Sequence, residues 1–126
     1  MADELTDQHG KPWMETVQVV IASGATGLSA AVNLKGRTPV AIQMPADWVD
    51  ADLTFQASLD GGTTYYNLYD EDGTEVTVKA DDDRVIALST LANFWHGGWI
   101  KIRSGTSGTP VDQTSSRTLI LATRLG

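Results

Sequence analysis

Side chains that could perform chemistry are few in this 126-residue sequence, and they are not spaced as in a catalytic or metal site. The two histidines, His9 and His96, have no second ligand at a spacing typical of zinc. The absence of cysteine excludes a disulfide, a thiolate nucleophile and a cysteine-bound zinc ion. No serine lies in the Gly-x-Ser-x-Gly motif of many hydrolases. We therefore predict that the protein is not an enzyme and uses no cofactor.

Two acidic clusters contain the ligand type that calcium prefers. Residues 70–73, Asp-Glu-Asp-Gly, resemble the start of a calcium loop, but the bidentate glutamate expected further along is missing. A hairpin turn explains this cluster with fewer assumptions. Asp81, Asp82 and Asp83 could also attract calcium, although a solvated loop that protects a sheet edge is the favoured interpretation. We assign no metal ligand in either cluster.

Aromatic residues give the strongest binding signal, because four Trp and three Tyr are many large rings for a small domain. Tyr65 and Tyr66 are adjacent, so on a strand they point to opposite faces and at least one of them leaves the core. Exposed rings can stack on sugars or anchor a protein interface. Most of the rings are still expected to pack inside the fold. The candidate interface residues are Trp13, Met14, Tyr65, Tyr66 and Trp95.

The elements that carry these side chains are predicted by alternation of apolar and polar residues. Leu53, Phe55, Ala57 and Leu59 lie on one face of a two-residue period, with polar residues between them. The pattern breaks at residues 60–62 and 72–73, where Asp-Gly pairs favour tight reversals. Short half-buried strands joined by tight turns are typical of antiparallel β proteins.

Eight or nine short strands follow from this pattern along the chain. We expect them at residues 16–22, 31–34, 39–44, 52–59, 64–69, 74–80, 84–88, 99–103 and 117–124. Their number and their polar loops predict an all-β, antiparallel two-sheet sandwich of jelly-roll type. An immunoglobulin-like sandwich is the nearest alternative, and it stays open at this point.

Composition limits the partners and the domain organisation. A net charge of −7 argues against nucleic acid, which basic patches bind, and no apolar run reaches the length needed to cross a membrane. The polar, acidic N-terminus is not expected to be a secretory signal. Residues 1–15 lack periodicity and are predicted to be an extended N-terminal arm, whereas residues 16–126 form one β-sandwich domain.

Four segments carry a resemblance to a known family: AIQMP at 41–45, LTFQAS at 53–58, DGGTTY at 60–65 and IKIRSGTSGTPV at 100–111. Through them, residues 16–124 resemble small virion-associated proteins of tailed phages and prophages, which are mostly uncharacterised. The similarity lies in the strand pattern and the loop sequences rather than in a catalytic motif.

The resemblance implies a jelly-roll protein of the virion, either a head decoration or cement protein or the base of a head fibre. Its partners would be the major capsid protein or other virion subunits, and it would be a homo-oligomer, with a trimer favoured. It would act by burying interface rather than by catalysis, and it would reside in the virion after assembly in the host cytoplasm.

Two further expectations come from the residues themselves. The arm could lie across a neighbouring subunit and add to an open sheet edge, with Trp13 as its anchor. The alternative function is that of a carbohydrate-binding β-sandwich module that attaches to surface glycan. That alternative expects coplanar exposed rings, with Tyr65 or Tyr66 beside Trp95.

Overall fold

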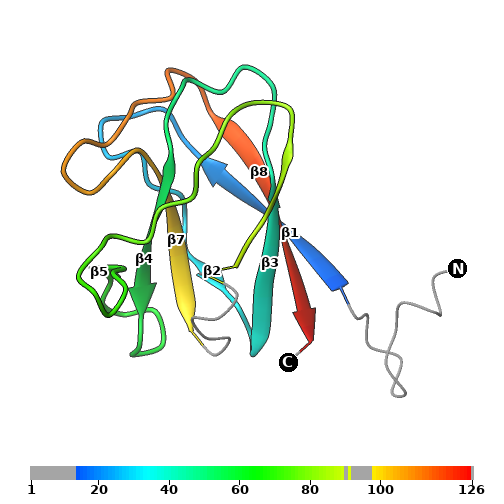
Figure 1. Ribbon diagram of the computed structural model, residues 1–126, viewed down its shortest axis with the longest axis vertical. Coiled ribbons are helices and arrows are strands. Elements are labelled where there is room, and N and C mark those ends of the chain that lie inside the picture. Colours follow the sequence, from blue (N-terminus) through cyan, green and yellow to red (C-terminus); the bar gives the residue numbers. More distant parts are fainter. Residues whose placement is uncertain (1–13, 90, 92–97, 126) are drawn as a thin grey trace, which may run out of the picture.

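The computed structural model of the protein describes residues 14–89, 91 and 98–125 (Figure 1). Eight β-strands form in these residues. They are β1 (Met14–Ile21), β2 (Val32–Asn33), β3 (Arg37–Gln43), β4 (Leu53–Ser58), β5 (Tyr66–Asn67), β6 (Val85–Ala87), β7 (Trp99–Ser104) and β8 (Arg117–Leu125). No helix in this part of the chain is long and apolar enough to cross a membrane. The predicted all-β class is confirmed.

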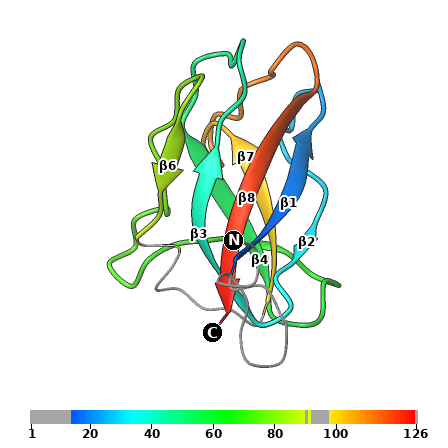
Figure 2. The same cartoon turned by 90° about the vertical axis from the view of Figure 1, so that its right-hand side faces the viewer.

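The strands form two four-stranded antiparallel sheets. We call β1-β8-β3-β6 the front sheet and β2-β7-β4-β5 the back sheet, after the view in Figure 2, where the front sheet lies nearest the reader. The pairs β4–β5, β3–β6, β2–β7 and β1–β8 are nested along the chain, with successive pairs in alternate sheets. The chain is therefore one long hairpin rolled into two layers, which is a jelly roll and not the immunoglobulin order.

The core lies between the two sheets, because every second residue of a strand points inward. The apolar side chains of the strands that are at most 2% exposed are Val19, Ile21, Ile42, Leu53, Phe55, Ile100, Ile102, Leu119 and Leu121. Trp48 packs into the same core, and its indole N–H donates to the carbonyl oxygen of Ala51 at 3.0 Å. This tryptophan has the structural role that was expected for most of the rings.

The expected strands match the observed ones to within two residues at each end, with one exception. The strand predicted at 74–80 is absent, because this segment changes its pairing partner partway. Val76 donates to the carbonyl oxygen of Leu68, whereas Val78 exchanges two backbone hydrogen bonds with Leu53. Neither pairing continues for long enough to make a regular strand. The turn expected before it is present, since the N–H of Gly73 donates to the carbonyl oxygen of Asp70.

The sandwich begins earlier than residue 16. Met14 and Glu15 belong to β1 and pair with Arg124 and Thr123 of β8. The extension follows from the length of β8, which offers nine residues as partners and so continues the ladder. The remaining part of the predicted arm, residues 1–13, lies outside the described residues.

Candidate interaction surfaces

The predicted interface residues do not gather in one place. Trp13 and Trp95 lie outside the described residues. Met14 is 53% exposed at the start of β1, in the front sheet. Tyr65 and Tyr66 lie at β5, in the back sheet, so the three described members of the set do not share a surface.

Tyr65 packs against the outer side of the back sheet. The ammonium nitrogen of Lys101 lies 4.3 Å from the centroid of its ring, a cation–π contact. Burial, followed by the negative charge of Asp60, raises the pKa of the Tyr65 hydroxyl. Because the ring is covered on this face, Tyr65 serves packing more than binding.

Tyr66 points to the other side of the same sheet, since it pairs with Ala57, whose side chain packs against the core. Its ring is 74% exposed and stands beside Leu59, which is 76% exposed. Together with neighbouring residues they line a hollow of about 330 Å³. The two tyrosines therefore do not form one flat platform for a sugar.

The outer side of the front sheet is almost free of charge. Two rows of side chains cross its four strands: Gln18, Ile120, Gln43 and Val85 in one, and Thr16, Ala122, Ala41 and Ala87 in the other. The pair Val20 and Thr118 lies next to the row that contains Gln18. The pair Met14 and Arg124 lies next to the row that contains Thr16. We call this surface, without Arg124, the uncharged face.

The uncharged face contrasts with the rest of an acidic chain. Val85 is 67% exposed, Met14 53% and Val20 43%, so apolar groups are presented to solvent. The net charge of the chain is −7, yet no carboxylate lies in either row. Exposed apolar groups with depleted charge are typical of the centre of a protein interface. This face is the broadest candidate for a docking surface.

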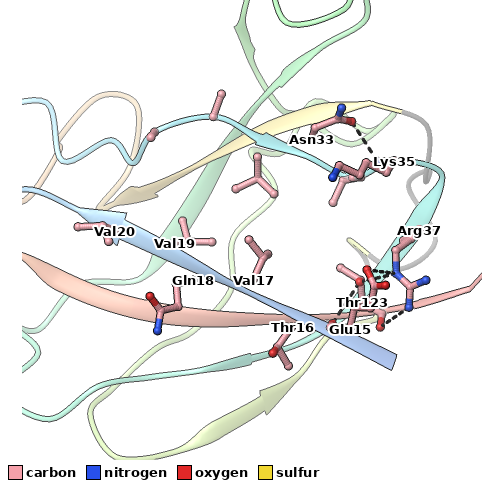
Figure 3. Close-up of a pocket in the computed structure, with 14 residues that line it drawn as sticks. Glu15, Thr16, Val17, Gln18, Val19, Val20, Asn33, Lys35, Arg37 and Thr123 are labelled. Atoms are coloured by element: carbon pink, nitrogen blue, oxygen red, sulfur yellow. Dashed lines mark hydrogen bonds and ion pairs between the residues drawn. The ribbon is translucent and has the colours of Figure 1, made fainter. Parts of the chain in front are cut away.

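A second candidate lies where the two sheets part, between β1 and the segment 30–35 that contains β2. The gap has a volume of about 360 Å³, and its walls combine valine and alanine side chains with polar and charged ones such as Asn33, Lys35 and Arg37 (Figure 3). Val17 and Val19 point from β1 toward the β2 side, whereas Thr16 and Gln18 point away from it. Val17 is 38% exposed although it faces inward, because β2 is only two residues long and does not cover it. We call this gap the edge groove.

Arg37 closes one end of the edge groove. Its Nε lies 3.5 Å from Oε1 of Glu15 and donates to Oγ1 of Thr123 at 3.0 Å. The Thr123 hydroxyl in turn donates to the carbonyl oxygen of Glu15 at 3.2 Å. Since Arg37 is on β3 and Glu15 on β1, these bonds tie the first strand across β8. They fix the position of the sheet edge.

Arg103 holds the outer side of the back sheet together. The guanidinium donates to the Thr54 hydroxyl at 3.2 Å, to Oδ1 of Asn67 at 2.6 Å and to Oε2 of Glu75 at 3.3 Å. Glu75 also accepts the backbone N–H of Ser107. The cluster fastens the hairpin after β5 and the loop after β7, so its role is structural.

Gln113 is a further buried polar residue that sequence reasoning does not single out for a role. Its amide accepts the N–H of Val49 at 2.8 Å and donates to the Val49 carbonyl and to the Ser104 hydroxyl, both at 2.8 Å. These bonds join two loops that are distant in the sequence. No local pattern could have predicted them, because a glutamine in a polar loop is ordinarily exposed.

The acidic loops stabilise turns. Asp60 accepts the Ser58 hydroxyl at 2.7 Å and the Thr64 N–H at 2.8 Å, and these bonds, the first foremost, lower the pKa of Asp60 to about 2. Asp82 has a raised pKa because of desolvation and the neighbouring carboxylates of Asp81 and Asp83. Within the described ranges, no three acidic or histidine side chains gather as a metal site would require.

Comparison with known proteins yields little. No family model matches the chain, and no curated protein matches it. Among solved structures, the chain is similar to the Yersinia pseudotuberculosis-derived mitogen YPM, with a TM-score of 0.38 and 14% identity. The match covers 90% of this chain and 86% of that chain. A similarity this weak supports no inference about function.

Proposed function

We propose that the protein is a structural component of a tailed-phage virion that binds capsid or other virion subunits and assembles as a homo-oligomer. It is a head decoration or cement protein, or the base of a head fibre, and it performs no catalysis. The resemblance of residues 16–124 to virion-associated proteins suggests the setting, and the jelly roll supplies a rigid two-sheet frame. It resides in the virion.

The uncharged face is the observation that carries this proposal. Two rows without a carboxylate, on a chain of net charge −7, offer a surface that meets a partner without burying unpaired charge. Ala41, Ala87 and Ala122 lie side by side in one row, so a partner can approach the sheet closely there. If the homo-oligomer binds several subunits of a symmetric shell at once, a modest affinity at each contact would give a much higher overall affinity.

The proposal is tested with phage heads, emptied of DNA, from the phage or prophage whose genome encodes the protein. The protein should co-sediment with the heads, and Ala122→Arg should weaken the binding at least roughly tenfold by placing a charge in the interface. Ala46→Arg is the matched control, because Ala46 is exposed in the loop after β3 and lies outside the uncharged face. Binding that neither variant changes would remove this face from the proposal.

A genomic observation tests the setting independently. The gene of a head protein is expected beside the genes for the major capsid protein and the portal. A gene that stands among unrelated metabolic genes, together with a failure to bind heads, would contradict the virion role.

Glycan binding is the second candidate, favoured by the exposed ring of Tyr66 beside a hollow of about 330 Å³. A single ring can stack on one face of a sugar. This function predicts saturable binding on a glycan array that Tyr66→Ala abolishes. Tyr69→Ala is the control, since Tyr69 is 50% exposed but does not line the hollow. An array without a hit would exclude this candidate for the glycans it displays.

A further inference from the structure

The free edge of β1 is long and open. β1 pairs with β8 on one side only, and on its other side Ser29 forms a bridge with Ile21 at the end of the strand. Seven consecutive residues, Met14 to Val20, are thus left with an unpaired edge among the described residues. Backbone N–H and C=O groups on such an edge can pair with another extended chain.

Within residues 14–20, this edge carries little of the usual protection against pairing. Its sequence, METVQVVI, contains no lysine and no proline, and its one charge, Glu15, is engaged by Arg37 at 3.5 Å. The opposite edge of the same sheet differs, because β6 has only three residues and directly follows three aspartates and Arg84. Short strands and charges are the devices that normally block edges. Of the two edges of the front sheet, the β1 edge is the one that residues 14–89 and 98–125 leave open to pairing.

The edge groove provides room for the side chains of an added strand. Val17 faces this groove and is 38% exposed, and the opposite wall contains Ala30, Ala31 and Val32. An added strand would place every second residue into the groove and the others on the outer side of the sheet. Small apolar residues at the inward positions fit these walls.

We propose that the strand added to β1 is β1 of a second copy of this chain, running antiparallel about a two-fold axis at Val17. The free edge is centred on Val17, so this register pairs its whole length. Val17 then lies opposite Val17 of the second copy, and Thr16 lies opposite Gln18 of that copy. In this arrangement, residues that point inward in one copy lie opposite residues that point inward in the other. The alternation of the two strands is therefore in phase.

Charge at the contact itself does not oppose a second copy, because each joined edge carries only one charged residue. Two chains of net charge −7 repel each other over most of their surfaces, but this contact brings together only Glu15, which lies opposite Val19 of the second copy. The same residues are used on both sides, which is the property of a two-fold contact. The two front sheets would join into one continuous sheet across the dimer, with both uncharged faces on the same side.

The first test measures the mass of the purified full-length protein by sedimentation velocity, so its outcome does not depend on head binding. A dimer is expected, in place of the trimer that the resemblance favours. Val17→Lys should raise the dissociation constant at least roughly tenfold, because it directs a charge into the joined seam. Gln18→Lys is the matched control and should remain a dimer, since residue 18 points to the outer side. Wild-type protein that is a monomer or a trimer would overturn the proposal, as would a dimer that Val17→Lys leaves intact.

The second test uses the absence of cysteine from the chain, which makes any introduced thiol unique. Antiparallel partners have Cα atoms about 4.5–5.5 Å apart, within the range of a disulfide. Val17→Cys should therefore form a covalent dimer on mild oxidation, and the wild-type fold should be retained because cysteine is small. Val85→Cys, on the opposite edge strand, is the control and should remain mostly monomeric on a denaturing gel. Equal cross-linking at both positions, or none at position 17, would overturn the proposal.

Discussion

At the scale of single residues, buried polar side chains secure this fold. Arg103 is 4% exposed and Gln113 is fully buried, and both bond to segments far from them in the sequence. A buried charge without a partner is strongly destabilising, whereas a complete network replaces the lost water. The loops of the sandwich are therefore held by specific partners and not only by apolar contact.

Removing Glu75 alone from the Arg103 cluster is expected to lower the free energy of unfolding more than removing Glu75 and Arg103 together. Glu75→Leu should lower the free energy of unfolding by roughly 3 kcal/mol, because it leaves a buried guanidinium without its carboxylate. In the double variant with Arg103→Leu, part of this loss should be recovered. Urea unfolding of the two single variants and the double variant measures the difference. If the double variant loses the sum of the unfolding free energies lost by the two single variants, the two side chains act independently.

The carboxylate of Asp60 makes stability depend on pH in the acid range. Its folded pKa of about 2 lies below the ordinary value of 3.8, so the unfolded chain takes up the proton first as the pH falls. Its contribution to stability is therefore complete above about pH 5 and is lost between about pH 4 and pH 2.

The pH effect is measured by urea unfolding of the wild type and Asp60→Asn at several pH values. The wild type should be the more stable at neutral pH, and the difference should shrink as the pH approaches 2. The bonds responsible are short contacts to Ser58 and Thr64. A difference that stays constant with pH would show that the carboxylate charge is not involved.

At the scale of elements, β1 is tied to its neighbours from its first residues. Met14 and Glu15 pair with β8, and Glu15 also contacts Arg37 of β3. Truncation experiments on the N-terminal arm must therefore stop before residue 14 if they are to leave the sandwich whole.

A chain that starts at Met14 should keep the free energy of unfolding of the full chain to within about 0.5 kcal/mol. A chain that starts at Thr16 should lose roughly 1–2 kcal/mol, because it lacks the Glu15 contacts with Arg37 and Thr123. Thermal unfolding of both chains checks this. If the arm lies across a neighbouring virion subunit, as the sequence predicts, the chain that starts at Met14 should be folded yet bind heads more weakly than the full chain. If this chain binds heads as tightly as the full chain does, the arm makes no contact that head binding requires.

Sequence predicts the elements well because alternation is a local property. Phe55 follows Leu53 at a spacing of two, and both are fully buried as expected. Pairing partners are not local, since the same alternation would suit any neighbouring strand. The nested order of the sheets, and hence the alignment of Ala41 with Ala122 on the uncharged face, could not be read from the pattern. The edge groove could not be foreseen either, because it depends on how short β2 is.

Ring size, which singles out all the candidate interface residues except Met14, has a physical limit as a criterion for a binding site. Large rings serve packing as often as binding, and Tyr65 beneath Lys101 is an example. The surfaces that the fold presents are built instead from valine, alanine, threonine and glutamine on β1, β3, β6 and β8. Each of these residues is unremarkable alone, and only the register brings them together.

At the scale of the whole molecule, the jelly roll divides the surface by charge. The acidic residues concentrate in loops such as 70–72 and 81–83, whereas the front sheet presents its two rows without a carboxylate. A joined pair of copies would double the area of this uncharged face and keep the acidic loops in solvent. The proposed head binding and dimerisation would then use different parts of one sheet, its face and its edge, and the variants Ala122→Arg and Val17→Lys would separate them.

The pairing of the first strand with the last governs how the molecule is made. Glu15 and Thr123 are 108 positions apart, so the ribosome must release almost the entire chain before β1 can find β8. Contacts this distant slow folding, commonly to milliseconds or seconds. During synthesis both edges of β1 are unpaired, and on a polysome neighbouring nascent chains would present the same strand to one another. Chaperone demand during expression is the practical consequence of that topology.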